Sequence, residues 1–212
     1  MSTIPQTRTG PPPTRVGGTL DQWTDLDLAE RARTNRSANE AGLAFSELYR
    51  RHFKRVYGYH LLRTGNIDDA QDLTSQTFMA ALEGIHRYSG RGSFAAWLMS
   101  IAHNKMAMHF RGRRPVAALE EWEQLPQPNG NPEDLAHRHG IVHQVRAALR
   151  KLPAERAEAF VLRTFGGLSA GDTAQVLGKS EAAVKMHVHR ALKDLRQILE
   201  VVPGIAAHLE EE

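Results

Sequence analysis

Apolar residues recur every three or four positions along most of the chain, a spacing that brings them to one face of an α-helix. The first series predicts an amphipathic helix from about Ala41 to Leu62, with repeating positions Phe45, Leu48, Tyr49, His52, Phe53 and Val56. A second helix is expected after the turn TGNIDDA, because Asp68 and Asp69 suit the positive end of a helix dipole. Its apolar series comprises Leu73, Phe78, Met79, Leu82 and Ile85.

A third helix is expected after YSGRGSF, where glycines interrupt the pattern and Ser93 can cap a new helix. It should end before Pro115. A second helical block starts near Leu135, with apolar stripes before and after Pro153: Val142, Val145, Leu149 and Leu152, then Ala157, Phe160, Val161 and Phe165. No useful strand-like alternation is present, so the sequence predicts an all-α protein with two helical domains.

The segments between and before these helical blocks have a different composition. Met1 to Asn39 is rich in proline with little periodicity, and we expect it to be mostly disordered, with one helical turn around Leu26–Arg33. Three prolines, an asparagine and a glycine mark a flexible linker between the domains: Pro126, Pro128, Asn129, Gly130 and Pro132. The predicted architecture is therefore two helical domains joined by a linker.

Charge adds a clue to the partner. The net charge is only +3, but Leu43–Arg114 carries 11 Lys and Arg against 5 Asp and Glu, and Ile141–Leu199 carries 10 against 5. Pro115–Gly140 between them holds five acids and one Arg. Two basic blocks on either side of an acidic spacer favour binding of a polyanion. The chain has no cysteine and no apolar run long enough to span a bilayer, so we expect a cytoplasmic protein.

The segment SAGDTAQVLGKSEAAVKMHVHRALKDL, residues 169–195, has the pattern of a helix-turn-helix. Ser169 and Asp172 fit a capping box, Gly178 permits a sharp turn, and Ser180 can cap the second helix. On that helix Met186, His189, Arg190 and Lys193 share the face opposite the apolar stripe, with Lys185 and His187 on its flanks. Such a face reads the DNA major groove, whereas the alternative is a merely solvated surface.

The segment GLSAGDTAQVLGKSEAAVKMHVHRALKDLR resembles the promoter-reading region 4 of extracytoplasmic-function sigma factors. Upstream, DAQDLTSQTFMAAL resembles the family's helix that binds RNA polymerase, and GSFAAWLMSIAHNKMAMHFRGRRP resembles its promoter-melting helix. The resemblance implies region 2, a three- to four-helix bundle, over residues 41–114 and region 4 over 140–200. Residues 1–40 would be a disordered extension, 115–139 the linker and 201–212 a tail.

The resemblance also implies a role for individual residues in transcription initiation. Polymerase would be bound by Asp69, Asp72 and Gln76. The minus-ten element would be melted by Trp97, His103, Asn104, Arg111, Arg113 and Arg114, with the turn Tyr88–Ser93 holding an unstacked base. The minus-thirty-five element would be read by Ser180, Glu181, Lys185, Met186, His187 and Arg190. An anti-sigma factor is a further expected partner, besides core polymerase and promoter DNA.

Several of these residues have simpler interpretations. Trp97 could belong to the core, the Arg cluster could be a solvated helix end, and Asp69 and Asp72 could serve only the helix dipole. Members of the family often carry other residues at Gln76 and Met108, and Ser-Arg at Met186–His187, so we expect an altered minus-thirty-five preference. The acidic spacer would pass through polymerase as a nucleic-acid mimic, or it is an ordinary linker.

No motif for catalysis or metal binding is present. The eleven histidines include His137 and His139 in the linker and His187 and His189 on one helix, but none has metal-ligand spacing. We expect no cofactor, no metal and no enzymatic activity. Two alternatives remain at this point: a stand-alone helix-turn-helix regulator that binds operator DNA without polymerase, and a helical metal hydrolase with an added DNA-binding domain.

Overall fold

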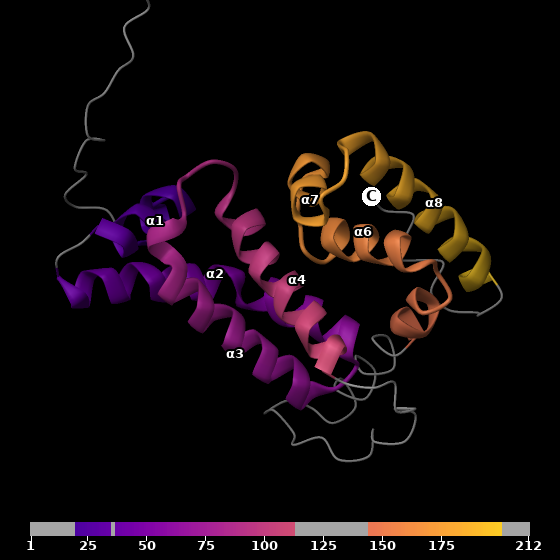
Figure 1. Cartoon of the computed structure of the whole chain (residues 1–212), viewed down its shortest axis with the longest axis horizontal. Coiled ribbons are helices and arrows are strands. Elements are labelled where there is room, and N and C mark those ends of the chain that lie inside the picture. Colours follow the sequence, from indigo (N-terminus) through magenta and orange to yellow (C-terminus); the bar gives the residue numbers. More distant parts are fainter. Residues whose placement is uncertain (1–19, 35–36, 113–143, 201–212) are drawn as a thin grey trace, which may run out of the picture.

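The computed structural model describes residues 20–34, 37–112 and 144–200, and within these ranges it contains helices and no strand (Figure 1). The expected all-α fold with two helical domains is confirmed for this part of the chain. The first domain comprises η1 (Leu20–Gln22), α1 (Asp25–Thr34), α2 (Ala38–Thr64), α3 (Ile67–Gly84), η2 (Ile85–Arg87) and α4 (Phe94–Gly112). The second comprises a short helix at 144–149, α6 (Ala154–Thr164), α7 (Ala170–Leu177) and α8 (Glu181–Glu200).

Local sequence explains where α2 ends and α3 begins. Gly65 follows α2 with a φ of 67°, a left-handed conformation that glycine adopts without steric cost, and its N–H bonds to the carbonyl of Leu61. Asn66 then caps α3, because its side-chain oxygen accepts the backbone N–H of Asp69 at 2.9 Å. The two helices therefore reverse direction within three residues and pack against each other along their length.

The core of the first domain lies between α1, α2, α3 and α4. Its largest fully buried side chains come mainly from two helices: Leu48, Val56 and Tyr59 of α2, and Leu98, Met99 and Met106 of α4. Burial of a Leu or Met side chain of this size is worth about 1.5–3 kcal/mol each. The buried faces of α2 and α4 therefore hold these helices in place, and the exposed side chains of α4 are carried on a rigid element.

The described part of the N-terminal segment differs from the expected disorder. Where one helical turn is expected around Leu26–Arg33, residues 25–34 form the ten-residue helix α1, and its Leu28 and Ala29 are completely buried against α2. Thr24 begins the helix by accepting the N–H of Asp27 on its hydroxyl, while Asp27 accepts the N–H of Thr24. Residues 1–19, 113–143 and 201–212 lie outside the described ranges, and with them the linker, the tail, His137 and His139.

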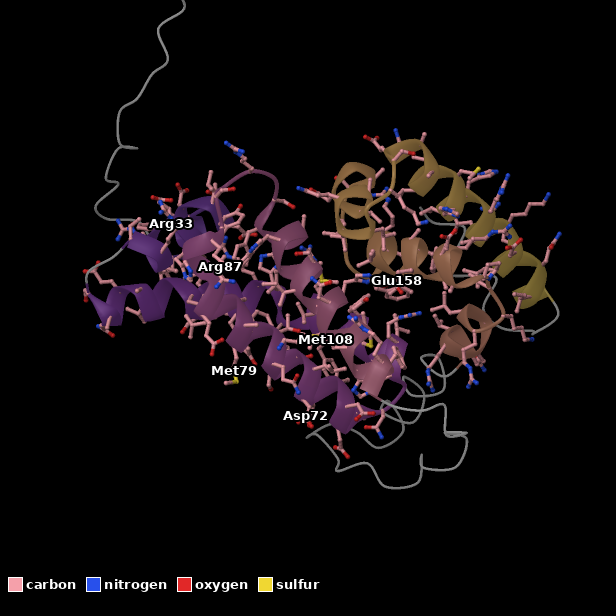
Figure 2. The ribbon with its side chains drawn as sticks, in the orientation of Figure 1. Arg33, Asp72, Met79, Arg87, Met108 and Glu158 are labelled. Carbon is pink, nitrogen blue, oxygen red and sulfur yellow. The ribbon has the colours of Figure 1, made fainter. Side chains whose placement is uncertain are left out.

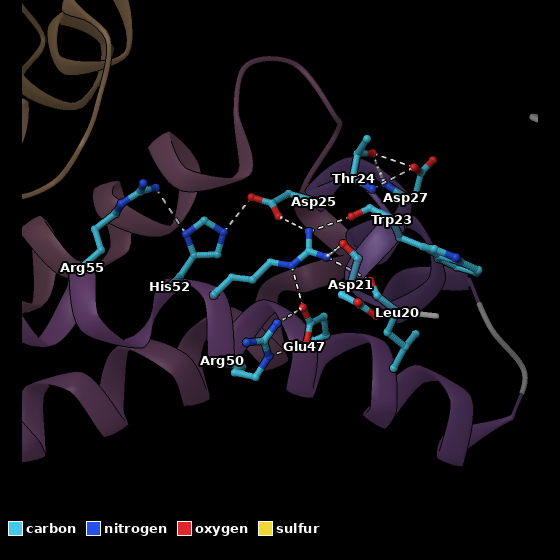
Figure 3. A network of polar contacts seen from close by, with 11 residues as sticks. Leu20, Asp21, Trp23, Thr24, Asp25, Asp27, Glu47, Arg50, His52 and Arg55 are labelled. Carbon is cyan, nitrogen blue, oxygen red and sulfur yellow. Dashed lines mark hydrogen bonds and ion pairs between the residues drawn. The ribbon is translucent and has the colours of Figure 1, made fainter. Parts of the chain in front are cut away.

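A polar network anchors this N-terminal segment (Figure 3). The guanidinium of Arg51 donates hydrogen bonds of 2.7–3.1 Å to three backbone carbonyls, those of Leu20, Asp21 and Trp23. It also binds the carboxylates of Asp25 and Glu47, and Asp25 in turn lies 2.7 Å from Nε2 of His52. Hydrogen bonds from Arg50 and Arg51 lower the pKa of Glu47 to about 2, so this carboxylate stays charged.

The second domain contains the expected helix-turn-helix. Ser169 caps α7 by accepting the N–H of Asp172 at 3.0 Å, and Gly178 ends the helix with a φ of 62°. Ser180 accepts the N–H of Ala183 at the start of α8. The apolar faces of α6, α7 and α8 meet in a small core, whose fully buried side chains include Leu162, Leu168, Val184 and Ala191. Figure 1 shows this domain beside the first, with α7 next to α4.

Candidate nucleic-acid and polymerase interface

The outer face of α8 carries most of the residues expected to read duplex DNA. Lys185, Met186 and Arg190 are exposed, while Val184 and Ala191 on the opposite side are completely buried. Glu181 is also exposed and pairs with Lys185 at 2.7 Å, one helical turn away. Because exposed pairs of this kind contribute little to stability, Lys185 can exchange Glu181 for a phosphate at small cost.

His187 differs from the expected placement on the outer flank of this helix. Only 14% of its side chain is exposed, and its Nε2 lies 3.7 Å from Glu155 of α6. Glu155 also accepts a 2.6 Å hydrogen bond from Lys179, which lowers the pKa of Glu155. The ring of His187 therefore helps to tie α8 to α6, and a helical wheel misses this because the partner carboxylate lies on a different helix.

Trp97 belongs to an aromatic cluster at the start of α4. Its ring lies 5.4 Å from that of Tyr88 and 5.5 Å from that of Phe94, and Trp97 is only partly buried. The hydroxyl of Tyr88 donates to the carbonyl of Gly92 and so closes the turn before α4. Trp97 therefore packs against its aromatic neighbours and still remains partly accessible to solvent, so both of its expected roles are compatible with this position.

The other residues expected to contact single-stranded DNA divide into three groups. Asn104 and Arg111 are exposed on α4, while Arg113 and Arg114 lie outside the described residues. His103 has a different environment from the expected open surface. Its Nδ1 lies 3.1 Å from Glu158 of the second domain and 3.2 Å from the hydroxyl of Tyr59, so in this conformation that ring nitrogen is engaged by the neighbouring domain.

The residues expected to bind polymerase lie along α3. Asp72 and Gln76 are exposed and one turn apart. Asp69 is less accessible, with 18% of its side chain exposed and its carboxylate 3.7 Å from Nε2 of His109 on α4. Asp69 therefore contributes to packing of α3 on α4, whereas Asp72 and Gln76 point to solvent.

Sequence reasoning missed an apolar part of this surface. Met79 and Leu82 belong to the apolar series that predicted α3, yet they are 63% and 52% exposed. Met79 lies one turn after Gln76 and on the same face as Asp72; Figure 2 shows Asp72 and Met79 on the outer side of α3. The spacing 72, 76, 79 could have indicated this face, because these positions fall within one side of a helix.

The described part of the chain offers neither a metal site nor a helix that could cross a membrane. Among residues 20–34, 37–112 and 144–200, no group of three or more His, Asp or Glu side chains could hold a metal ion. Within the same ranges, no helix combines the length and the apolar character that crossing a membrane requires.

Two family models match the chain in the order of its two domains. The model described as Sigma-70 region 2 matches residues 48–116, and the model described as Sigma-70, region 4 matches residues 143–195. The first match includes α3 and α4, and the second includes the whole helix-turn-helix. A stand-alone regulator would need only the second of these, so the pair of matches favours a sigma factor over that alternative.

Curated relatives and solved structures agree with these matches. The chain is 37% identical over 189 residues to the ECF RNA polymerase sigma factor BldN of Streptomyces coelicolor, covering 87% of this chain and 69% of BldN. It is 32% identical to the ECF sigma factor SigE of Mycolicibacterium smegmatis, covering 85% of this chain and 74% of SigE. The structure of CnrH in complex with the cytosolic domain of CnrY matches with a TM-score of 0.65 and 27% identity, over 84% of this chain and 98% of that one.

A second solved structure, the sigma factor RpoE from Bartonella quintana with the anti-sigma factor NepR, supports the fold alone. It has a TM-score of 0.58 and 22% identity, and the match covers 74% of this chain and 98% of that one. The two domains, their order and the relatives lead to one conclusion. The chain belongs to the extracytoplasmic-function (ECF) sigma factors, which bind core RNA polymerase and direct transcription initiation.

Proposed function

We propose that the two domains of this sigma factor read two separate promoter elements. The second domain would place α8 in the major groove at the minus-thirty-five element. The observation that carries this part is the exposed face of Lys185, Met186 and Arg190 behind a capped turn. An Arg on such a face can donate two hydrogen bonds to a guanine edge, and a neighbouring Lys can neutralise a phosphate.

The first domain would capture unstacked bases of the minus-ten element. Trp97 offers a partly accessible ring beside the turn Tyr88–Ser93, and Asn104 and Arg111 offer a polar edge and a cation farther along α4. Stacking of one base on an aromatic side chain is worth about 1–3 kcal/mol. A few such contacts can offset the unstacking of a similar number of bases, which gives α4 a direct part in promoter opening.

The outer face of α3 would bind core polymerase. Asp72 and Gln76 supply polar groups, and Met79, one turn after Gln76, supplies an exposed apolar side chain. An apolar centre with a polar rim is the usual composition of a protein–protein interface. This face points away from α4 in Figure 2, so polymerase and DNA would bind different sides of the first domain.

Sigma factors are generally DNA-binding regulators without catalytic activity, and we infer the same for this chain, acting where polymerase transcribes in the cytoplasm. The solved relatives CnrH and RpoE were each determined with a bound protein, CnrY and the anti-sigma factor NepR. We infer that an anti-sigma partner also binds this chain.

Substitution of Trp97 tests the proposed division of labour. Trp97→Ala should leave polymerase-dependent binding of duplex promoter within about twofold but reduce run-off transcription by about tenfold or more, because stacking is lost only in the open complex. A template with a premelted minus-ten bubble should restore most of the transcript. Trp97→Phe, which retains an aromatic ring, serves as the matched control and should lose less. If the bubble template rescues nothing, Trp97 has no part in melting.

A further inference from the structure

Glu158 of α6 connects the two domains through three side chains of the first. The hydroxyl of Tyr59 donates to one of its carboxylate oxygens at 2.7 Å, and Nδ1 of His103 lies 3.1 Å from the same oxygen. Arg63 binds the other oxygen at 3.0 Å. Glu158 is 8% exposed and Tyr59 is completely buried, so solvent does not compete for these contacts.

This environment keeps the carboxylate charged. Burial raises the pKa of Glu158, but the hydrogen bond from His103, the charge of Arg63 and the hydrogen bond from Tyr59 outweigh it and leave the pKa below its ordinary value. Burial also raises the pKa of Tyr59 well above its usual range, so the phenol remains a donor. A buried carboxylate with three suitable partners is satisfied only in this arrangement of the domains.

Two other contacts support the same arrangement. Arg146, before α6, donates a 2.7 Å hydrogen bond to the carbonyl of Thr64 at the end of α2. Gly65 leaves room for it, because a Cβ there would collide with the Arg146 guanidinium. Near α7, a Cβ at Gly167 would come within 3.0 Å of the guanidinium of Arg55. The domains therefore meet at several points, and α7 lies beside α4 (Figure 1).

The arrangement in which the two domains contact each other, here called closed, cannot be the one that reads a complete promoter. The minus-ten and minus-thirty-five elements are about 25 base pairs apart, which is roughly 85 Å of duplex. A compact unit of about 150 residues has a radius of gyration of only about 15 Å. In addition, the carboxylate of Glu158 contacts the ring of His103, which lies on the face of α4 that is proposed to contact DNA. The domains must separate for both elements to be bound, and residues 113–143 would span about 100 Å if fully extended.

We propose that Glu158, with Tyr59, Arg63 and His103, forms an autoinhibitory latch that holds the free sigma factor closed. The proposal rests on the proposed function in one respect, namely that the α4 face covered by the second domain binds promoter DNA. The latch would reduce binding of promoter DNA by the free protein. Binding of core polymerase would separate the domains and release α4. A charged carboxylate suits this purpose because water can replace its partners once the domains open.

The distance between the two domains tests the latch without any transcription assay. Because the chain has no cysteine, spin labels can be attached at Gln71→Cys on α3 and Gln197→Cys on α8, two exposed positions. Pulsed electron paramagnetic resonance of the free protein should give one narrow distance. Glu158→Ala should shift the distribution to longer and broader distances. Glu155→Ala is the matched control, because this acid lies one turn earlier on α6 and, of the described residues, pairs with Lys179 and His187 of its own domain.

The second variant and the functional readout separate the possible failures. Tyr59→Phe removes only the hydroxyl that donates to Glu158, and this variant decides the result if Glu158→Ala does not fold. A longer distance between the spin labels in Tyr59→Phe supports the latch, and an unchanged distance overturns it. If about one wild-type molecule in ten is open, Glu158→Ala should bind promoter DNA without polymerase about tenfold more tightly than the wild type does, because nearly all molecules of the variant are open. An unchanged label distance in folded Glu158→Ala, or an equal shift in Glu155→Ala, overturns the latch. Loss of wild-type run-off transcription would instead count against the proposed function.

Discussion

His60 is a buried histidine with an incomplete set of hydrogen bonds. Its Nε2 lies 3.1 Å from the hydroxyl of Thr77, whereas its Nδ1 has no partner among the residues that the structure describes, and the side chain is completely buried. Burial, with a smaller contribution from His109, lowers the pKa of His60 from 6.5 to about 4. The unfolded chain therefore binds a proton at a higher pH than the folded one, and stability is lost as the pH falls from about 6.5 towards 4.

Replacing His60 by Gln should weaken this pH dependence. The shift in pKa corresponds to about 3 kcal/mol of folding free energy between neutral pH and pH 4, which the wild type loses and the variant does not. Urea unfolding at pH 7 and at pH 4 measures both values, and the difference between the two proteins cancels the other titrating groups. Parallel losses of stability in the two proteins would contradict the assignment to His60.

Arg190 offers the sharpest residue-level test of DNA reading. Arg190→Ala should weaken recognition of the minus-thirty-five element by about 1–3 kcal/mol if its guanidinium reads a base. Arg196, also exposed on α8 but nearer its C-terminal end, provides the matched control as Arg196→Ala. Competition binding of the polymerase complex to promoters with intact and scrambled upstream elements gives the discrimination directly. Equal losses on both promoters would reduce Arg190 to a phosphate contact.

At the scale of elements, the helix-turn-helix could be predicted from the sequence because its determinants are local. Ser169, Gly178 and Ser180 each act within four residues of their own position. Helix α1 could not be predicted, because only two of its side chains, Leu28 and Ala29, are buried. The segment just before it is held by Arg51, which lies more than 25 residues away and bonds the carbonyls of Leu20 and Trp23. For the same reason a single helix pattern misplaced His103 and His187, whose partners lie on other helices.

Arg51 should be more important for α1 than its neighbour Arg50. Arg51→Lys replaces a planar fork with a point charge that cannot bond three carbonyls and two carboxylates together, so α1 should detach more often. Hydrogen exchange of amides 25–34 should accelerate about tenfold or more, while the amides of α4 change little. Arg50→Lys is the control, because Arg50 is largely exposed and, within the described part of the chain, its guanidinium bonds only Glu47. Similar exchange rates in the two variants would contradict the role of Arg51, and the docking of α1 would then rest on burial of Leu28 and Ala29.

The outer face of α3 gives a prediction about polymerase binding. Met79→Lys should raise the dissociation constant for core polymerase by about tenfold, because a charge would replace an apolar contact at the centre of the proposed interface. Met108→Lys serves as the control; Met108 is 61% exposed on α4 and Met79 is 63% exposed. Fluorescence anisotropy of labelled protein titrated with core polymerase measures both. A larger loss for Met108→Lys would move the interface from α3 to α4.

At the scale of the whole molecule, two helical domains share one chain, and in this structure their buried apolar residues form one continuous cluster beside the polar contacts of Glu158. The sequence predicted the number, the order and the all-helical character of the domains, since these follow from periodicity and motifs. It did not predict that Glu158 would reach Tyr59 and His103, because contacts across about 55 to 100 positions leave no local pattern. The interaction between domains is therefore visible only in three dimensions.

Permanganate reactivity of promoter thymines tests the central claim most directly. The purified protein and core polymerase should together make thymines near the start site reactive, and neither should do so alone, because the two domains open DNA only when polymerase holds them apart. Reactivity with the protein alone, or none with both components on a promoter that the complex binds, would contradict the account.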